Sequence, residues 1–206
     1  MRSAAAALDH LVLATPDLAA TTVWFTEQTG VVPSVGGAHV GKGTRNTLCS
    51  LGMTSYLEIV GPDPEQSDPA AGRPFGIDDL TEARIVSWAI AVPEMEAALS
   101  AARAAGYDPG SAAAMQRQQP DGELLSWTLT VAPSVTVPFL IDWGTSVHPA
   151  AHAAQGLELV ELRARHLRPA DLEADLEAVG VTMGIEPGLA ALIVELRGPL
   201  GTVRFS

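Results

Sequence analysis

The sequence has a single cysteine, few aromatic residues and few basic side chains. Cys49 cannot form a disulfide within the chain, and this cysteine usage suits a reducing cytoplasm. Lysine and arginine number 12 against 24 aspartates and glutamates, which leaves a formal net charge of -12. A chain of this charge repels a phosphate backbone, so we expect no nucleic-acid partner.

Long apolar runs are missing as well. No stretch of about 18 apolar residues exists to cross a bilayer. Residues 1–7 carry one positive charge but lack the apolar segment of a signal peptide. We therefore expect neither a membrane partner nor a secretory leader. With 47% hydrophobic and 17% charged residues, the 206-residue chain is expected to fold as one sizeable domain or two small, packed ones.

The sequence does contain a repeat. A short apolar strand runs into a proline that starts a helix, and the helix ends at a glycine, first from Leu8 to Gly30 and again from Val86 to Gly106. Strand-like runs follow each helix, and the second unit has a polar loop with the turn signal Asp121-Gly122. The order predicts two βαβββ units, residues 8–61 and 84–144, joined by a linker rich in Pro, Gly and Asp.

We predict an α+β fold in which the paired βαβββ units curl their sheets into a concave trough, within a domain over residues 1–145. A third, shorter βαββ-type copy is expected over residues 157–206. Because it has no fourth copy to pair with, its sheet must bury one face against the first two units or against another chain. We therefore predict a homodimer.

Strand alternation selects the residues that face the trough. If Leu57 and Ile59 face the helices, Tyr56 and Glu58 face the concave side. Glu58, on the last strand of the first unit, would then meet His10 on the first strand. Such a carboxylate or imidazole projects into a pocket instead of a packed core.

A resemblance to a known superfamily is carried by three segments: residues 8–18, the glycine-rich loop at 37–46, and residues 56–60. The chain resembles the vicinal-oxygen-chelate superfamily, and more closely its glyoxalase-like branch. The resemblance covers roughly residues 8–145. It implies a trough that binds a small molecule, in a superfamily that hosts lyases, isomerases, ring-cleaving dioxygenases and drug-binding proteins.

Members of that superfamily commonly hold a divalent metal with residues from the first and last strands of two paired units. Carried over by position, the resemblance implies His10 and Glu58 from the first unit, with Trp88 and Asp142 from the second. Trp88 cannot be a ligand, which leaves His10, Glu58 and Asp142 with water. This open set suits Mn, Fe, Ni or Mg better than a closed structural zinc site, and Zn stays among the candidate cofactors.

Glu58 and His39 are the candidate catalytic acid–base groups, since the loop that carries His39 could approach the trough mouth. The alternative for Glu58 is a structural ion pair with an arginine such as Arg45 or Arg117, and for His39 a solvated loop position. The candidate substrate-binding residues carry polar or aromatic side chains, with ordinary packing as the alternative for the tryptophans: Asn46, Trp88, Arg117, Trp127 and Trp143.

His148 and His152 have the spacing of a helical ligand pair, with His166 as a distant third, but no acidic residue lies near the pair in the sequence, so we assign them no metal. Two functions then remain open. The first is a metal-dependent enzyme, a lyase, isomerase or dioxygenase, in which a pocket carboxylate or histidine moves a proton. The second is a non-catalytic protein that sequesters a small molecule between tryptophans, which the substitution at Trp88 favours.

Overall fold

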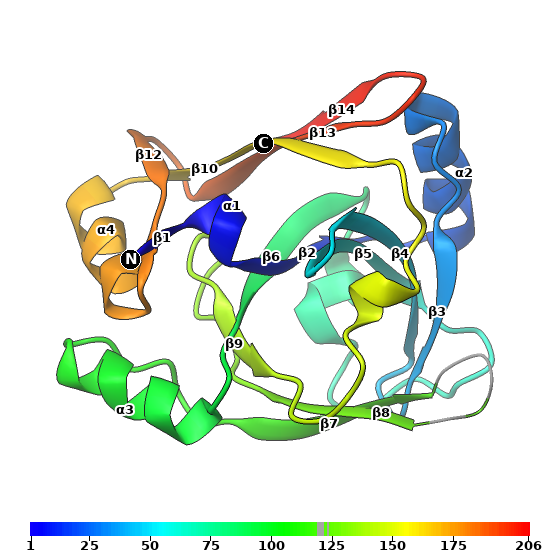
Figure 1. Cartoon of the computed structure of the whole chain (residues 1–206). Coiled ribbons are helices and arrows are strands. Elements are labelled where there is room, and N and C mark those ends of the chain that lie inside the picture. Colours follow the sequence, from blue (N-terminus) through cyan, green and yellow to red (C-terminus); the bar gives the residue numbers. More distant parts are fainter. Residues whose placement is uncertain (119–121, 123) are drawn as a thin grey trace.

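A computed structural model gives the structure of the chain and describes residues 1–118, 122 and 124–206 (Figure 1). The fold is mixed α+β, rich in sheet and with few helices, so the predicted fold class is confirmed. The predicted turn at Asp121-Gly122 lies partly outside the described residues. No helix in the described part of the chain is long and apolar enough to cross a membrane.

The elements of the first half are β1 (Arg2–Ser3), α1 (Ala4–Ala7), β2 (Leu8–Ala14), α2 (Leu18–Thr29), β3 (Ser34–His39), β4 (Thr44–Gly52), β5 (Ser55–Pro62) and the 3-10 helix η1 (Pro74–Asp79). Those of the second half are β6 (Arg84–Ala91), α3 (Met95–Ala104), β7 (Ala113–Gln118), β8 (Leu124–Leu129), β9 (Phe139–Asp142) and η2 (Pro149–Ala151). The C-terminal elements are β10 (Glu158–His166), α4 (Pro169–Ala178), β11 (Val181–Thr182), β12 (Gly184–Pro187), β13 (Ala191–Arg197) and β14 (Thr202–Phe205).

Eight strands form a closed barrel in the order β2-β5-β4-β3-β7-β8-β9-β6, where the sequence predicted an open trough. Closure occurs where β3 meets β7, with Ala38 opposite Gln118 and His39 opposite Arg117. Gly37 permits this approach: its φ of 145° is rare for other residues, and a Cβ there would lie 1.9 Å from the carbonyl oxygen of Gln118.

The two halves of the barrel share a register that corrects the sequence alignment. β2 and β5 run parallel with Val12 opposite Glu58, and β6 and β9 run parallel with Ala89 opposite Phe139. When the prolines that follow β2 and β6 are aligned, Ser87 corresponds to His10. By the same register Phe139 corresponds to Glu58.

Alternate residues of the barrel strands face two different cores. Leu57 and Ile59 point outward, as predicted, into a core shared with Phe25 of α2 and Leu99 of α3. Inward-facing Val12 and Phe139 belong to a separate cluster inside the barrel. The second cluster includes Ile77 of η1, so the segment predicted as a linker enters the barrel.

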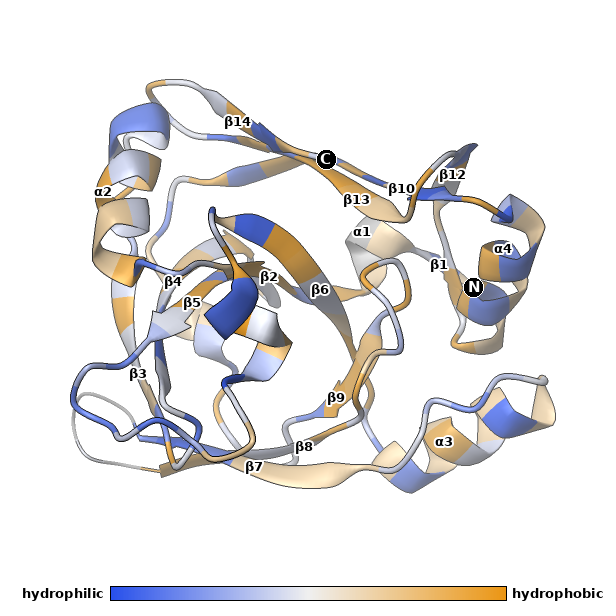
Figure 2. Ribbon diagram, turned by 180° about the vertical axis from the view of Figure 1, so that it is seen from behind, coloured by the Kyte–Doolittle hydropathy of each residue, from blue (hydrophilic) through white to orange (hydrophobic). Residues whose placement is uncertain are grey.

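The C-terminal sheet, in the order β12-β10-β13-β14, lies across one side of the barrel between α2 and α4 (Figure 1). Its inner face is apolar, and β13 is coloured mainly hydrophobic in Figure 2. Leu192 and Val194 of β13 and Leu172 of α4 belong to the outer core of the barrel. The face that the sequence left without a partner is therefore covered within the chain.

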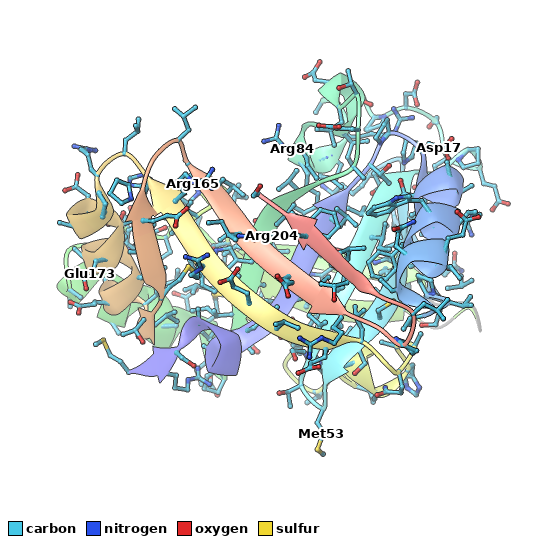
Figure 3. The ribbon with its side chains drawn as sticks, turned by 90° about the horizontal axis from the view of Figure 1, so that it is seen from above. Asp17, Met53, Arg84, Arg165, Glu173 and Arg204 are labelled. Atoms are coloured by element: carbon cyan, nitrogen blue, oxygen red, sulfur yellow. The ribbon has the colours of Figure 1, made fainter. Side chains whose placement is uncertain are left out.

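The opposite face of this sheet is charged. Arg165 pairs with Glu186, and Arg204 lies 3.7 Å from Glu161, which also pairs with Arg163. Figure 3 shows Arg165 and Arg204 on this sheet. Such half-exposed ion pairs stabilise a surface weakly. The sheet thus shows no bare apolar face to a second copy, and the homodimer stays a prediction.

Candidate functional site

The barrel encloses a cavity of about 580 Å³, a volume within the range of small-molecule sites. Polar side chains gather on the half built by β2 to β5 and on β7, whereas apolar and aromatic side chains from β8 and β9 cover the other half. Phe75, in the segment predicted as a linker, also lines the cavity.

Glu58 of β5 is buried at the polar wall and 7% exposed. Asn46 Nδ2 donates a 2.5 Å hydrogen bond to its Oε1, and His39 Nε2 lies 3.4 Å from the same oxygen. His10 Nε2 lies 4.0 Å from Oε2. Burial alone would raise the pKa of this carboxyl, but the hydrogen bond and charge of His39, the charge of His10 and the Asn46 bond outweigh it and lower the pKa from 4.5 to about 2. Glu58 is therefore ionised at neutral pH.

His10 of β2 is held by the fully buried Asp9, whose Oδ1 lies 2.6 Å from His10 Nδ1. Neighbours on a strand normally point to opposite faces. Here the pairing of β2 with β6 shifts register between Leu8 and His10, which accompanies the contact. On the other side of the ring, Tyr56 stacks on His10 at a centroid distance of 4.7 Å. The imidazole is thus fixed with Nε2 toward Glu58.

Asp9 also anchors the segment after β9. Its Oδ2 accepts hydrogen bonds from Trp143 Nε1 at 2.9 Å and from His148 Nε2 at 3.0 Å. Burial raises the pKa of Asp9, but the hydrogen bonds and charges of His10 and His148 overcome it and lower the pKa from 3.8 to about 2. One buried carboxylate therefore joins His10 to Trp143, a wall residue of the cavity.

Asn46 of β4 joins two charged groups of the wall. Its Nδ2 donates to Glu58, while its Oδ1 accepts from Arg117 Nη1 at 3.2 Å. Gly36 makes room for this pair, because a Cβ there would lie 2.0 Å from Asn46 Oδ1 and 2.6 Å from Arg117 Nη1. His39, on the other side of Asn46, is fixed through Nδ1 by Thr44 Oγ1 at 3.0 Å.

Seven of the nine predicted site residues line the cavity: His10, His39, Asn46, Glu58, Arg117, Trp127 and Trp143. Their roles stay predictions. Trp88 and Asp142 do not line it, and both placements correct the sequence prediction.

Trp88 is fully buried in the outer core, where its Nε1 donates to the carbonyl oxygen of Thr136 at 3.2 Å. In the pairing of β2 with β6, Trp88 lies opposite Leu11, which faces the outer core. The sequence alignment that matched Trp88 with His10 was therefore wrong by one residue. Asp142 ends β9 outside the cavity. Its oxygens accept the backbone N–H groups of Met95, at the start of α3, and of Gly144.

This donor set does not fit the metal site that the resemblance implied. In the second half, Ser87 and Phe139 occupy the positions that correspond to His10 and Glu58, and a phenyl ring cannot coordinate a metal ion. Asp142, the expected third ligand, is engaged by backbone amides elsewhere. Within the part of the chain that the structure describes, no group of three or more His, Cys, Asp or Glu side chains is placed to hold a metal ion.

The sequence reasoning missed Asp9 and His148. Asp9 stands beside His10 within the first motif, but strict alternation assigned it to the opposite face. His148 was considered only as a partner of His152, and its actual partner is Asp9, which is distant in the sequence. A buried aspartate next to a pocket histidine was the available signal.

Comparisons with known proteins agree with this architecture. A family model described as glyoxalase-like domain matches residues 8–180. The crystal structure of a hypothetical protein from Staphylococcus aureus is similar with a TM-score of 0.67 and 11% identity, covering 97% of this chain and 98% of that one. At this identity the likeness shows the fold alone.

Methylmalonyl-CoA epimerase from Mycobacterium tuberculosis has a TM-score of 0.46 and 17% identity, over 73% of this chain and 95% of that one. A variant of methylmalonyl-CoA epimerase from Streptomyces coelicolor has a TM-score of 0.43 and 19% identity, and the match covers 68% of this chain and 96% of that one. Neither likeness is close enough to bear on the site. No curated protein matches the sequence. The family match spans most of the chain, from the first barrel strand through α4, so the chain belongs to the glyoxalase-like domain family.

Proposed function

We propose that the cavity is the active site of an enzyme that moves a proton on a small molecule, with Glu58, His10 and His39 as the proton-transferring groups. One observation carries the proposal. A buried, ionised carboxylate lies in the cavity wall with an imidazole nitrogen at 3.4 Å on one side and another at 4.0 Å on the other. Positioned groups of this kind accelerate proton transfer typically by about 10²–10⁴-fold.

Each group has a distinct part. Glu58 accepts a proton from the ligand, because it is anionic at neutral pH. His10, oriented by Asp9 through Nδ1, and His39, oriented by Thr44 through Nδ1, present Nε2 toward Glu58 and pass the proton on. Both orienting contacts keep the imidazoles in place without occupying the nitrogen that faces the carboxylate.

The reaction class follows from this set. Isomerases and lyases that act beside a carbonyl begin with such a proton transfer, so the proposal covers both. We do not extend it to a dioxygenase, because His10 and Glu58 are the only two of the three predicted metal ligands that the fold brings together. The mechanism therefore uses the chain's own groups and includes no metal step.

The second candidate function is a non-catalytic binding protein. Ser87 and Phe139, which occupy the positions that mirror His10 and Glu58, supply neither an imidazole nor a carboxylate to that half of the cavity. Trp127 and Trp143, with ring centroids 5.3 Å apart, form an aromatic wall against which a ligand can pack.

Deuterium exchange distinguishes the two functions. Small carbonyl compounds are incubated with the protein in D₂O, and loss of the proton next to the carbonyl is followed by NMR. We expect exchange with wild-type protein, loss of exchange with Glu58→Gln, and full exchange with Glu65→Gln, which changes an exposed glutamate. Compounds that quench tryptophan fluorescence yet never exchange would favour the binding protein.

A further inference from the structure

The charges that line the cavity are opposite in sign to those of the whole chain. Acidic residues outnumber basic ones two to one in the sequence. Among the described lining residues, Glu58 is the only acidic one, against Lys42 and Arg117. We infer that the ligand is a small carboxylate, bound through Arg117, with an apolar or aromatic body. The inference rests on the proposed function in that it takes this cavity as the ligand site.

Arg117 is buried and 4% exposed, yet no carboxylate lies within the 4.0 Å of an ion pair in the described part of the chain. Its one hydrogen bond in that part goes to the neutral amide of Asn46. A guanidinium carries five N–H donors, and a buried charge without a counter-ion is costly. A ligand carboxylate supplies both the charge and the acceptors, in the two-pronged geometry that arginine favours.

Asn46 keeps this cation available. Standing between Arg117 and Glu58, it donates to the carboxylate and accepts from the guanidinium, so the two charged groups do not pair directly. The arrangement also places a bound carboxylate one side chain away from Glu58.

Trp127 and Trp143 give the cavity an apolar wall. Both rings line the cavity with their centroids 5.3 Å apart, and Met115 and Leu129 lie beside them in the lining. Walls of this kind bury the apolar part of a ligand. The carboxylate at Arg117 and the apolar body of the ligand thus occupy different parts of the same cavity.

Matched ligand pairs test the inference. Phenylacetate, phenylpyruvate and naphthylacetate are each compared with the corresponding primary amide by calorimetric titration, and phenylphosphonate distinguishes a carboxylate site from a general phosphate site. We expect wild-type protein to bind the carboxylates at least about tenfold more tightly than the amides, the difference that one charge-assisted pair provides. Arg117→Gln should abolish this preference, and Arg45→Gln, which changes an arginine outside the cavity, should keep it.

Equal or tighter binding of the amides, a preference that survives Arg117→Gln, or no binding of any carboxylate would overturn the inference. Tighter binding of phenylphosphonate would replace the carboxylate by a phosphate group. Because these titrations measure binding, they are independent of catalysis. Carboxylate preference in a protein that never exchanges deuterium would leave the inference standing while the proposed function fails.

Discussion

Replacing Asp9 by asparagine removes the charge that joins His10, Trp143 and His148 while it preserves the shape of the side chain. The magnitude follows from the pKa of Asp9, which folding lowers from 3.8 to about 2. At about 1.4 kcal/mol per pKa unit, ionised Asp9 contributes roughly 2 kcal/mol to the free energy of unfolding. The folded-state pKa is the lower one, so this contribution is complete above about pH 4 and disappears as the pH falls toward 2.

The assay is urea unfolding of wild-type and Asp9→Asn protein between pH 7 and pH 2.5. We expect the variant to be less stable by roughly 2 kcal/mol at neutral pH, with the difference shrinking below pH 4. Asp79→Asn, at an exposed position, serves as the control and should change stability little at any pH. A difference between Asp9→Asn and wild type that stays constant down to pH 2.5, or that is absent at pH 7, would show that the Asp9 charge does not stabilise the fold.

Three further predictions concern the cavity wall, the metal and the C-terminal sheet. Gly36→Ala forces a methyl group against Asn46 and Arg117, so calorimetry should show loss of carboxylate binding, and the free energy of unfolding should fall by about 1–3 kcal/mol. Gly184→Ala is the control and should bind carboxylates normally, because a Cβ there meets only an arginine side chain at 3.5 Å. Treatment with a chelator should leave the melting temperature unchanged, because the predicted third ligand Asp142 lies outside the cavity; a marked fall would show a structural metal. Truncation after Gly156 should give aggregated protein in size-exclusion chromatography, because it uncovers the core that Leu192 and Val194 complete. A soluble fragment with an unchanged melting temperature would contradict the shared core.

Much of the fold could be predicted because its signals are local. Pro16 and Gly30 mark the ends of a helix observed at 18–29, where Asp17 caps the first turn and Gly30 adopts a left-handed φ of 77°. Alternation in β5 correctly assigned Leu57 and Ile59 to the outer core. Both signals depend on neighbouring residues, so a single sequence contains them.

Barrel closure could not be predicted in this way. It depends on two residue pairs between β3 and β7, which lie far apart in the sequence, and on the missing side chain of Gly37. The sequence indicates only that the loop that carries His39 could approach the trough mouth. Gly36 makes room for Arg117, a residue of the other half, and local patterns contain no information about such a contact.

The site shows the same division. Alternation indicated that His10 and Glu58 face one cavity, because both lie on strands of the first half and the pairing of β2 with β5 keeps its register from His10 onward. The prediction that Trp88 lines the cavity was wrong, because a shift of one residue moves every side chain of a strand to the opposite face. Aligning Pro16 with Pro93 would have selected Ser87, so this part of the error could have been avoided from the sequence.

The role of Glu58 is tested by comparing the rate of deuterium exchange in wild-type protein and in Glu58→Gln, with the carbonyl compound that exchanges fastest. The side chain of glutamine keeps the shape and can still contact Asn46, but it cannot accept the proton. We expect exchange to fall by about 10²-fold or more, while the affinity for the compound stays within a fewfold of wild type. Exchange at the wild-type rate in Glu58→Gln would contradict the assignment of Glu58 as the proton acceptor.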